Sequence, residues 1–279
     1  MTAHAPSLEL PGATLDVSRM PGHWLLARLG KRVLRPGGRE LTAKMLEALG
    51  IAPSDHLVEL APGLGATTRV ALAAGPASYV GIERDEAAAR LVRRVLRDGR
   101  DEVRQGIASK TGLDDGHATV LFGEAMLTMH TDEQKRAIVR EACRVLRAGG
   151  RYGIHELALT PDDLSTDERA EVERALSGAI HVGARPLTVA DWRALLEAEG
   201  LDVVASETAP MLLLEPGRLV ADEGLLGAVR VCVNTLRSSA ARRRVLEMRG
   251  VFRQYASKMC AVMLVAKKRG DLEPRAARP

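Results

Sequence analysis

Aromatic residues are scarce in this sequence of 279 residues. Two tryptophans, three tyrosines and two phenylalanines make up 3% of the chain, which leaves few surfaces on which nucleobases could stack. The 40 basic and 36 acidic residues are interspersed, and the resulting net charge of +4 identifies no partner. We therefore expect no nucleic-acid partner.

Cysteine is also rare, and its three positions, Cys143, Cys232 and Cys260, lie far apart. Their spacing does not match a metal-binding knuckle, and an odd number argues against a disulfide framework. No metal site is predicted. The composition is typical of a protein that works in a reducing compartment, so we expect a cytoplasmic location.

Long apolar runs are missing as well. No run reaches the ~20 residues that span a bilayer, and residues 1–10 lack the basic start and apolar stretch of a secretory signal. We therefore expect no membrane partner. The chain is nevertheless 46% hydrophobic, which is enough for a sizeable core.

Strand and helix patterns alternate from residue 56 onward. Repeated units of this length predict an α/β fold with a doubly wound, mostly parallel, Rossmann-like sheet of seven strands. The expected strands are His56–Leu60, Ser78–Glu83, Glu102–Gly106, Ala118–Phe122, Tyr152–Leu157, Leu201–Ser206 and Met259–Ala266.

Helical patterns frame this sheet. Two N-terminal helices are expected at about His23–Val33 and Glu40–Leu49, and a mostly helical insertion at Glu215–Tyr255 is expected to cover one end of the sheet. The predicted organisation is an N-terminal arm with cap helices (1–50), a core (51–206), a helical insertion (207–257), and a last strand with its tail (258–279).

The strongest local signal is the segment Val58–Thr67. An apolar strand ends in Glu59 and leads through small residues, including Gly63 and Gly65, into a helix that begins near Thr67. Small residues let the backbone turn sharply and approach a ligand closely. The helix N-terminus adds free N–H groups suited to a carboxylate or phosphate.

Two further features narrow the class of ligand that this segment could bind. Glu59 suits a cofactor that carries an ammonium group, whereas a carboxylate there would repel a dinucleotide pyrophosphate. The second strand ends in Glu83 and Arg84, where the acid can accept both hydroxyls of a ribose. That acid is shared with dinucleotide enzymes, so a nicotinamide-dependent oxidoreductase remains an alternative.

Four motifs occur in the order ELAPGLG, GIERD, QGIA and RVLRAGGRYGIHE. These motifs and their order resemble those of class I S-adenosylmethionine (SAM)-dependent methyltransferases, particularly those that act on small molecules. The resemblance covers roughly residues 56–157. It implies SAM as cofactor, with the methionine end near Glu59 to Gly65, the ribose at Glu83, the adenine beside Arg84, and the sulfonium after the fourth strand. The implied cofactor residues are Glu59, Ala61, Pro62, Gly63, Gly65, Thr67, Glu83, Arg84, Gly106, Ile107, Ala108, Gly123 and Glu124.

The sequence departs from this pattern at three positions. Ala61 stands where the family usually has its first glycine, and Ile107 where many members have an aspartate facing the adenine amino group. Thr119 lies where an aspartate often begins the fourth strand. The change at Ile107 removes a polar contact and predicts a more apolar adenine pocket.

Candidate catalytic residues follow the fifth predicted strand. His155 and Glu156 lie near its carboxyl end, which opens into the cleft of such sheets. Alternation sends their side chains to opposite faces, so just one of them is expected to reach the substrate. His155 is a candidate base at neutral pH, and the family often has an acid at the position of Glu156. His130 and His181 are further cleft candidates.

The acceptor pocket is expected from two segments, residues 23–38 and the insertion with its apolar stretch 211–214 and Met248. The run Arg242–Arg244 is interpreted as a solvated helix face or a subunit contact, and a homodimer is left open. The function indicated is methyl transfer from SAM to a small-molecule acceptor by in-line displacement. A non-catalytic SAM-binding regulatory protein is the second alternative.

Overall fold

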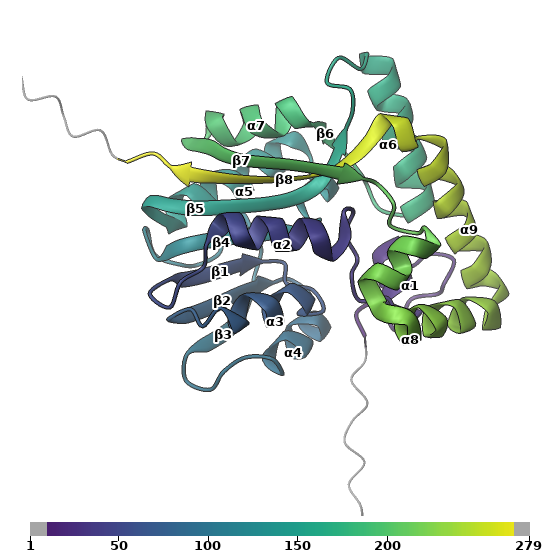
Figure 1. Ribbon diagram of the computed structural model, residues 1–279, viewed down its shortest axis with the longest axis horizontal. Helices are drawn as coiled ribbons and strands as arrows, with labels where there is room; N and C mark the ends of the chain where they lie inside the picture. Colours follow the sequence, from purple (N-terminus) through teal and green to yellow (C-terminus); the bar gives the residue numbers. More distant parts are fainter. Residues whose placement is uncertain (1–9, 271–279) are drawn as a thin grey trace, which may run out of the picture.

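A mixed β-sheet forms the centre of the computed structural model, which describes residues 10–270 (Figure 1). The main path of the sheet runs in the order β3-β2-β1-β4-β5-β8-β7, and short β6 pairs with β5 beside that path. The strands are β1 (His56–Leu60), β2 (Ser78–Glu83), β3 (Asp101–Gln105), β4 (Ala118–Glu124), β5 (Leu146–Leu159), β6 (Leu187–Thr188), β7 (Leu201–Pro210) and β8 (Met259–Lys268).

The parallel part of the sheet places several strand ends together. β1 pairs in parallel with β2 on one side and with β4 on the other, so the direction of winding reverses between β1 and β4. In the doubly wound folds, ligands bind outside the carboxyl ends of the strands at such a reversal. Among the strands of the described residues, β8 alone runs antiparallel, to both β5 and β7. The predicted doubly wound, mostly parallel sheet is therefore confirmed.

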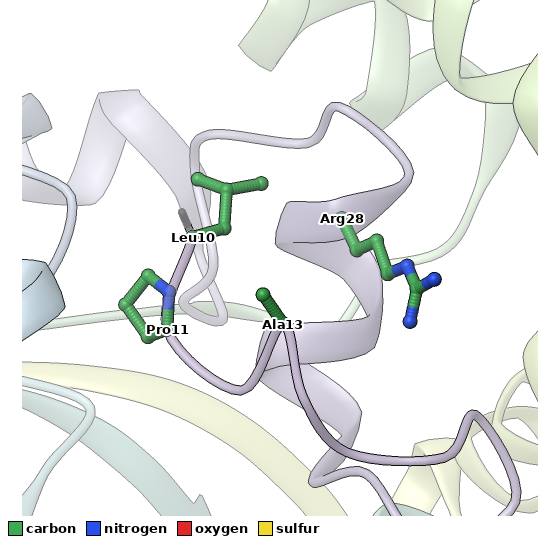
Figure 2. Close-up of a pocket in the computed structure, with 4 residues that line it drawn as sticks. All are labelled: Leu10, Pro11, Ala13 and Arg28. Atoms are coloured by element: carbon green, nitrogen blue, oxygen red, sulfur yellow. The ribbon is translucent and has the colours of Figure 1, made fainter. Parts of the chain in front are cut away.

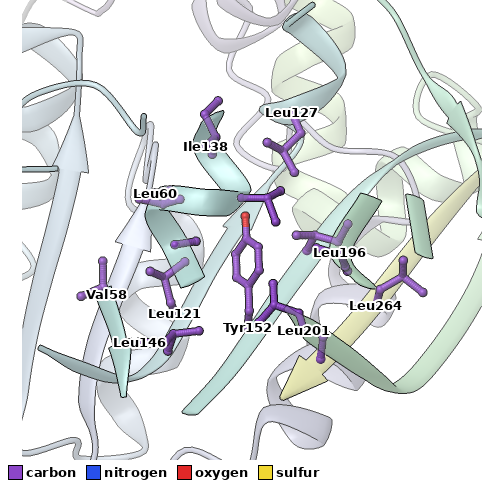
Figure 3. Close-up of a cluster of buried hydrophobic side chains, with 14 of the residues drawn as sticks. Val58, Leu60, Leu121, Leu127, Ile138, Leu146, Tyr152, Leu196, Leu201 and Leu264 are labelled. Carbon is purple, nitrogen blue, oxygen red and sulfur yellow. The ribbon is translucent and has the colours of Figure 1, made fainter. Parts of the chain in front are cut away.

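Helices cover both faces of the sheet. α2 (Gly38–Leu49), α3 (Ala66–Ala73) and α4 (Glu86–Arg93) pack on one face, and α5 (Asp132–Val145) and α7 (Val189–Ala198) pack on the other. Figure 3 shows the second of these cores, where the ring of Tyr152 lies among leucines that include Leu121, Leu146 and Leu201.

Four more helices gather at the carboxyl ends of the parallel strands (Figure 1). They are α1 (Gly22–Arg28), α6 (Thr166–Ile180), α8 (Pro216–Arg237) and α9 (Ser239–Gln254), and we call them the cap. The cap has an apolar core of its own, which includes Leu25, Leu176, Met248 and Phe252 and reaches Leu157 at the end of β5. Two short helices, η1 (Leu127–Met129) and η2 (Ala256–Lys258), complete the fold.

Local sequence accounts for several helix ends. Thr131 and Gln134 form a capping box at the start of α5, and Ser165 and Glu168 form another at the start of α6, so backbone groups at each terminus are paired. The side chain of Ser238 accepts a bond from the Ala241 N–H and begins α9. The mostly helical stretch predicted at Glu215–Tyr255 is therefore divided at Ser238 into α8 and α9, and α8 itself has a kink at Gly224, where φ is 72°.

Long-range contacts shift other boundaries. The first helix ends at Arg28, because the backbone N–H groups of Arg32 and Val33 both donate to Glu223 of α8 and not to a helical turn. β5 begins at Leu146, which pairs with Ala118, rather than at Tyr152. The two-residue strand β6 is too short to leave a pattern in the sequence.

Arg244 also departs from its expected exposure. Within the run Arg242–Arg244, the first two residues are exposed, but Arg244 is buried and donates to the carbonyls of Val17 and Met20. This arginine therefore ties the segment before α1 to α9. Among the helices of residues 10–270, none combines the length and apolarity required to span a bilayer.

Candidate active site

A cavity of about 610 Å³ lies between the carboxyl ends of β1, β2 and β4 and the cap. It brings together the predicted cofactor residues except Gly65 and Gly123, which are not part of its wall. The residues that line it from the predicted set are Glu59, Ala61, Pro62, Gly63, Thr67, Glu83, Arg84, Gly106, Ile107, Ala108 and Glu124.

The turn after β1 is built by left-handed backbone. Ala61, Gly63 and Gly65 have φ values of 52°, 57° and 70°, so the turn uses a conformation that side chains disfavour. A Cβ on Gly63 would meet nothing closer than 3.9 Å, which leaves room for a ligand beside it. Gly65 instead faces Val92 of α4, 3.6 Å from the position of its absent Cβ. Its role is to pack the turn on α4.

Glu83 is held rigidly at the end of β2. The N–H of Gly63 donates to its Oε2 and the N–H of Asp85 donates to its Oε1, each at 2.9 Å. Asp85 in turn caps α4 by accepting from Ala87 and Ala88. Each oxygen of a carboxylate has a second acceptor site, so Glu83 can still receive two hydroxyl groups from the cavity.

Glu59 is buried at the end of β1 and shares its Oε2 between two hydroxyl groups. Thr68 and Tyr79 each donate to that oxygen at 2.7 Å. Burial raises the pKa of Glu59 to about 7, although these two donors oppose the shift. Close to neutral pH this carboxyl can therefore gain or lose its charge.

Glu124 lies in the same wall and is partly buried, but its pKa shifts in the opposite direction from that of Glu59. Its Oε1 lies 3.0 Å from Nε of Arg35 and 2.8 Å from Nδ1 of His155, and Thr42 donates to it at 2.5 Å. Thr67 also donates to its second oxygen. Burial alone would raise the pKa of Glu124, but Arg35 and His155 outweigh that effect and lower it to about 2.

His155 is bonded on both sides and does not line the cavity. Nδ1 contacts Glu124, and Nε2 lies 2.6 Å from the carbonyl oxygen of Pro36. Both partners are acceptors, so both bonds form together only when each ring nitrogen carries a proton. The side chain is fully buried. His155 thus has no free nitrogen for a substrate, contrary to the role expected for it as a base.

Glu156 points to the other face of β5, as alternation predicts, and it is also fully buried. It accepts the N–H groups of Met126, Leu127 and Thr128 and the hydroxyl of Thr128, at 2.7 to 3.1 Å. Burial raises the pKa of Glu156, against these bonds. The residue holds the connection between β4 and η1 and does not reach the cavity, so the expectation that it contacts substrate is not supported.

Two histidines line the cavity: His130, a further cleft candidate from the sequence, and His23, which belongs to the segment 23–38 expected at the acceptor pocket. Nδ1 of His130 lies 2.9 Å from the Met126 carbonyl, so this nitrogen carries the proton and Nε2 is the acceptor of the neutral ring. Burial lowers the pKa of His130. His23, beside Trp24, has its pKa lowered by burial to about 4. His181 is not part of the wall.

The N-terminal segment closes the cavity as expected. Trp24, Arg32, Leu34, Arg35 and Pro36 all line it. Arg35 had no assigned role in the sequence, because its partners Glu124 and Thr42 become neighbours only through the fold.

A second, smaller hollow shares no lining residue with this site. It measures about 220 Å³ and is formed by Leu10, Pro11 and Ala13 with Arg28 of α1 (Figure 2). Its four lining residues include one cation and no acid, hydroxyl or thiol side chain. They offer no constellation for chemistry.

Comparisons with known proteins agree with this architecture. Residues 58–154 match the family model described as a methyltransferase domain. A relative from Haemophilus influenzae, described as an uncharacterized protein, is 31% identical over 222 residues, which are 78% of this chain and 86% of the relative.

Two solved structures share the fold at low sequence identity. Phosphoethanolamine N-methyltransferase 2 of Haemonchus contortus, in complex with SAM, is 14% identical, with a TM-score of 0.68 over 95% of this chain and 59% of that one. The MccD protein is 18% identical, with a TM-score of 0.67 over 84% and 99% of the two chains. The present chain belongs to the class I SAM-dependent methyltransferase family.

Proposed function

We propose that this enzyme transfers the methyl group of SAM to a small molecule held in the cavity between the sheet and the cap. The observation that carries this proposal is a set of three carboxylates at the ends of adjacent strands on one cavity wall, the buried Glu59 and Glu83 and the partly buried Glu124. A cavity of about 610 Å³ is in the range of small-molecule sites.

The residues present fit the parts of SAM. The open space beside Gly63 is a cradle that a Cβ would begin to fill. Glu83 has acceptor sites left for both ribose hydroxyls, Glu59 would face the ammonium group, and Arg35 would face the methionine carboxylate. The adenine ring would lie against Ile107 and Ala108, where half-exposed Ile107 offers only apolar contact.

Bound SAM would supply a methyl group on a positively charged sulfur, and transfer of that methyl group to an aligned nucleophile would release the sulfur as the neutral thioether of S-adenosylhomocysteine. The protein contributes mainly alignment, and holding two reactants in line can supply ~7–11 kcal/mol of the barrier. The cap shields the acceptor from water, and the ion pair of Arg35 with Glu124 holds the N-terminal segment against the sheet.

The first test is calorimetry with SAM, NAD and NADP. Heat with SAM alone is expected, whereas heat with a nicotinamide cofactor and none with SAM would exclude the proposal. Transfer of labelled methyl from SAM to a fraction of a metabolite extract then separates an enzyme from a non-catalytic SAM-binding protein.

Glu83→Ala tests the ribose contact. Hydrogen bonds to a charged acceptor contribute about 1.5–3 kcal/mol each, so the loss of one or two should raise the Kd for SAM by about 100-fold. Exposed Glu102→Ala on the neighbouring strand β3 is the matched control and should leave the Kd unchanged. An unchanged Kd in Glu83→Ala would show that the ribose lies elsewhere.

We further propose His130 as the base for acceptors that lose a proton. Nε2 of the neutral ring is an acceptor, and the lowered pKa keeps it neutral at physiological pH. His130→Gln should lower kcat by about 10² with little change in the Kd for SAM. The rate of the wild type should fall as acid protonates this ring, and the variant should lack that step in its pH profile. An unaltered profile in His130→Gln would contradict this role.

A further inference from the structure

The two ends of the cavity differ in chemistry. The wall formed by the strand ends carries Glu59, Glu83, Glu124 and Arg84, and the N-terminal segment adds Arg32 and Arg35. A second wall, formed by α6, α9 and the segment after β7, carries aliphatic, thioether and aromatic side chains, whereas α1 of the cap adds His23 and Trp24 to the cavity. We call this second wall the apolar subsite, and its members are Leu176 and Ile180 of α6, Met211 and Leu213 after β7, and Met248 and Phe252 of α9.

Packing holds the apolar subsite in shape. Leu176 and Met248 are each 1% exposed and belong to the same buried cluster as Met211, Leu213 and Phe252. A Cβ on Gly22 would lie 2.8 Å from the sulfur of Met248, so α1 presses directly on α9. The walls are therefore built into the cap core, and they do not depend on loosely held surface side chains.

Charged groups on the same helices are turned away or already paired. Arg244 binds backbone carbonyls, and Arg249 pairs with Glu215 at 3.0 Å. Neither arginine lines the cavity. His23, which does line it, is neutral because its pKa is lowered to about 4. A charged group that entered the apolar subsite would lose its hydration and meet no partner there, which is strongly unfavourable.

We propose that the methyl acceptor is an uncharged, largely hydrocarbon molecule, bound with its body in the apolar subsite and its nucleophile toward the strand ends. This inference rests on the proposed function, because it names the class of acceptor for the same cavity. It excludes acceptors that carry a carboxylate, phosphate or ammonium group at the end that enters the cap.

Tryptophan fluorescence provides a local readout. Of the two tryptophans in the sequence, Trp24 lines the cavity, whereas Trp192 of α7 is fully buried and donates to the Leu157 carbonyl. A ligand in the cavity should change the emission of Trp24. Trp24→Phe should abolish that change and thus identifies its source.

The probes are 1-octanol, 8-hydroxyoctanoate and 8-amino-1-octanol, which share one chain length and one hydroxyl group. The last two carry a charge at the opposite end, which would have to enter the cap, and we call all three the octyl probes. They are titrated into the full-length protein saturated with S-adenosylhomocysteine, which fills the cofactor end. We expect 1-octanol to bind at least about thirtyfold more tightly than either charged probe, because a charge in the apolar subsite loses its hydration and meets no partner. Binding of either charged probe within about threefold of 1-octanol would overturn the proposal.

Met248→Gln places a polar amide of similar length in the apolar subsite. It should weaken 1-octanol binding about tenfold while leaving S-adenosylhomocysteine binding unchanged. Leu246→Gln, on the same helix but 57% exposed, is the matched control and should have no effect. Met211→Gln gives an independent reading from another segment should Met248→Gln fail to fold. Unchanged 1-octanol affinity in a folded subsite variant would also overturn the proposal.

The proposed function and the acceptor class fail in different ways. If S-adenosylhomocysteine and SAM give no heat in calorimetry, the proposed function fails and the acceptor class fails with it. If S-adenosylhomocysteine binds but the three octyl probes bind equally or not at all, the acceptor class alone is wrong.

Discussion

Glu59 and Glu124 lie on one cavity wall, yet their surroundings push the two pKa values apart. Glu59 has only hydroxyl partners, and burial raises its pKa to about 7. Glu124 faces Arg35 and His155, which hold its pKa at about 2 in spite of burial. Glu124 therefore stays charged at neutral pH, whereas Glu59 responds to pH and to a positively charged ligand.

Glu59 should therefore make SAM affinity depend on pH. An ammonium group binds the carboxylate better than the neutral acid, so lowering the pH from about 8 to about 6 should weaken SAM binding by up to about tenfold. Calorimetry at both values measures this change. Glu59→Gln should bind SAM more weakly at about pH 8 and should show little of the pH dependence.

The same substitution should stabilise the free protein. A raised folded pKa means that protons favour the native state, so the contribution of Glu59 to stability is present below its unfolded pKa and is lost as pH rises toward about 7. Above about pH 7, Glu59→Gln removes a buried charge and should raise the Tm by several degrees. A lower Tm there, with SAM affinity equal to that of the wild type, would contradict both expectations.

At the scale of single residues, local sequence predicted the backbone-defined part of the site well. The turn around Gly63 and the acid Glu83 follow from short-range patterns, and the cavity lies where those patterns indicated. His155 shows where such reasoning ends. Its strand and face were predictable, but its partners Pro36 and Glu124 are distant in sequence, and they occupy both of its nitrogens.

Strand β5 is bonded to the connection between β4 and η1 through one buried side chain, that of Glu156. Glu156 accepts four hydrogen bonds from residues 126–128 and so fixes the connection between β4 and η1. Met126 and Thr128 of this connection line the cavity. The shape of this wall therefore depends on an acid that never contacts the ligand.

Glu156→Gln should lower the free energy of unfolding by about 2–4 kcal/mol. The amide has one acceptor oxygen, so its NH₂ group would face donors and leave some of them unpaired, at about 1–3 kcal/mol each. Denaturant unfolding measures the loss. Exposed Glu247→Gln on α9 should change stability by less than about 0.5 kcal/mol, and an equally small effect at Glu156 would refute the bonding described.

Some boundaries of helices and strands are set by neighbouring residues in the sequence, and others are set by contacts with residues far away in the sequence. β1 and β2 begin and end as predicted, because apolar runs bounded by turn residues define them locally. The end of α1 and the start of β5 could not be predicted in this way. They depend on Glu223 and Ala118, whose bonds to these segments exist only in the folded protein.

At the scale of the whole molecule, a buried cluster of charged residues joins the N-terminal segment to α8. Lys31 is fully buried, 3.4 Å from Asp222 and 3.7 Å from Glu223. Asp222 also accepts the N–H of Arg39 at 3.1 Å. Burial lowers the pKa of Lys31, while the two acids oppose that shift. This cluster positions residues 32–36 against the cavity.

Asp222→Asn should weaken both stability and ligand binding. Removing one partner of a buried ion pair typically costs about 3–5 kcal/mol, and Glu223 remains to offset part of it, so a loss of about 2 kcal/mol is expected. The Kd for SAM should rise as well, because the segment lines the cavity. Denaturant unfolding and calorimetry measure the two effects.

Glu40→Gln is the control for that substitution. Glu40 pairs with Arg218 at 3.1 Å, but its side chain is 74% exposed, so the substitution should cost less than about 1 kcal/mol. Equal stability of Asp222→Asn and the wild type would mean that the buried cluster does not hold the segment.

The placement of the apolar subsite has a consequence for how relatives of this protein diverge. The matched family region, residues 58–154, contains the turn after β1, Glu83 and Glu124, but none of the six residues of the apolar subsite. On the proposed function, most residues assigned to the methyl donor and all those assigned to the body of the acceptor therefore lie in separate stretches of sequence. Substitutions in the apolar subsite should then change the preferred acceptor more than the affinity for SAM.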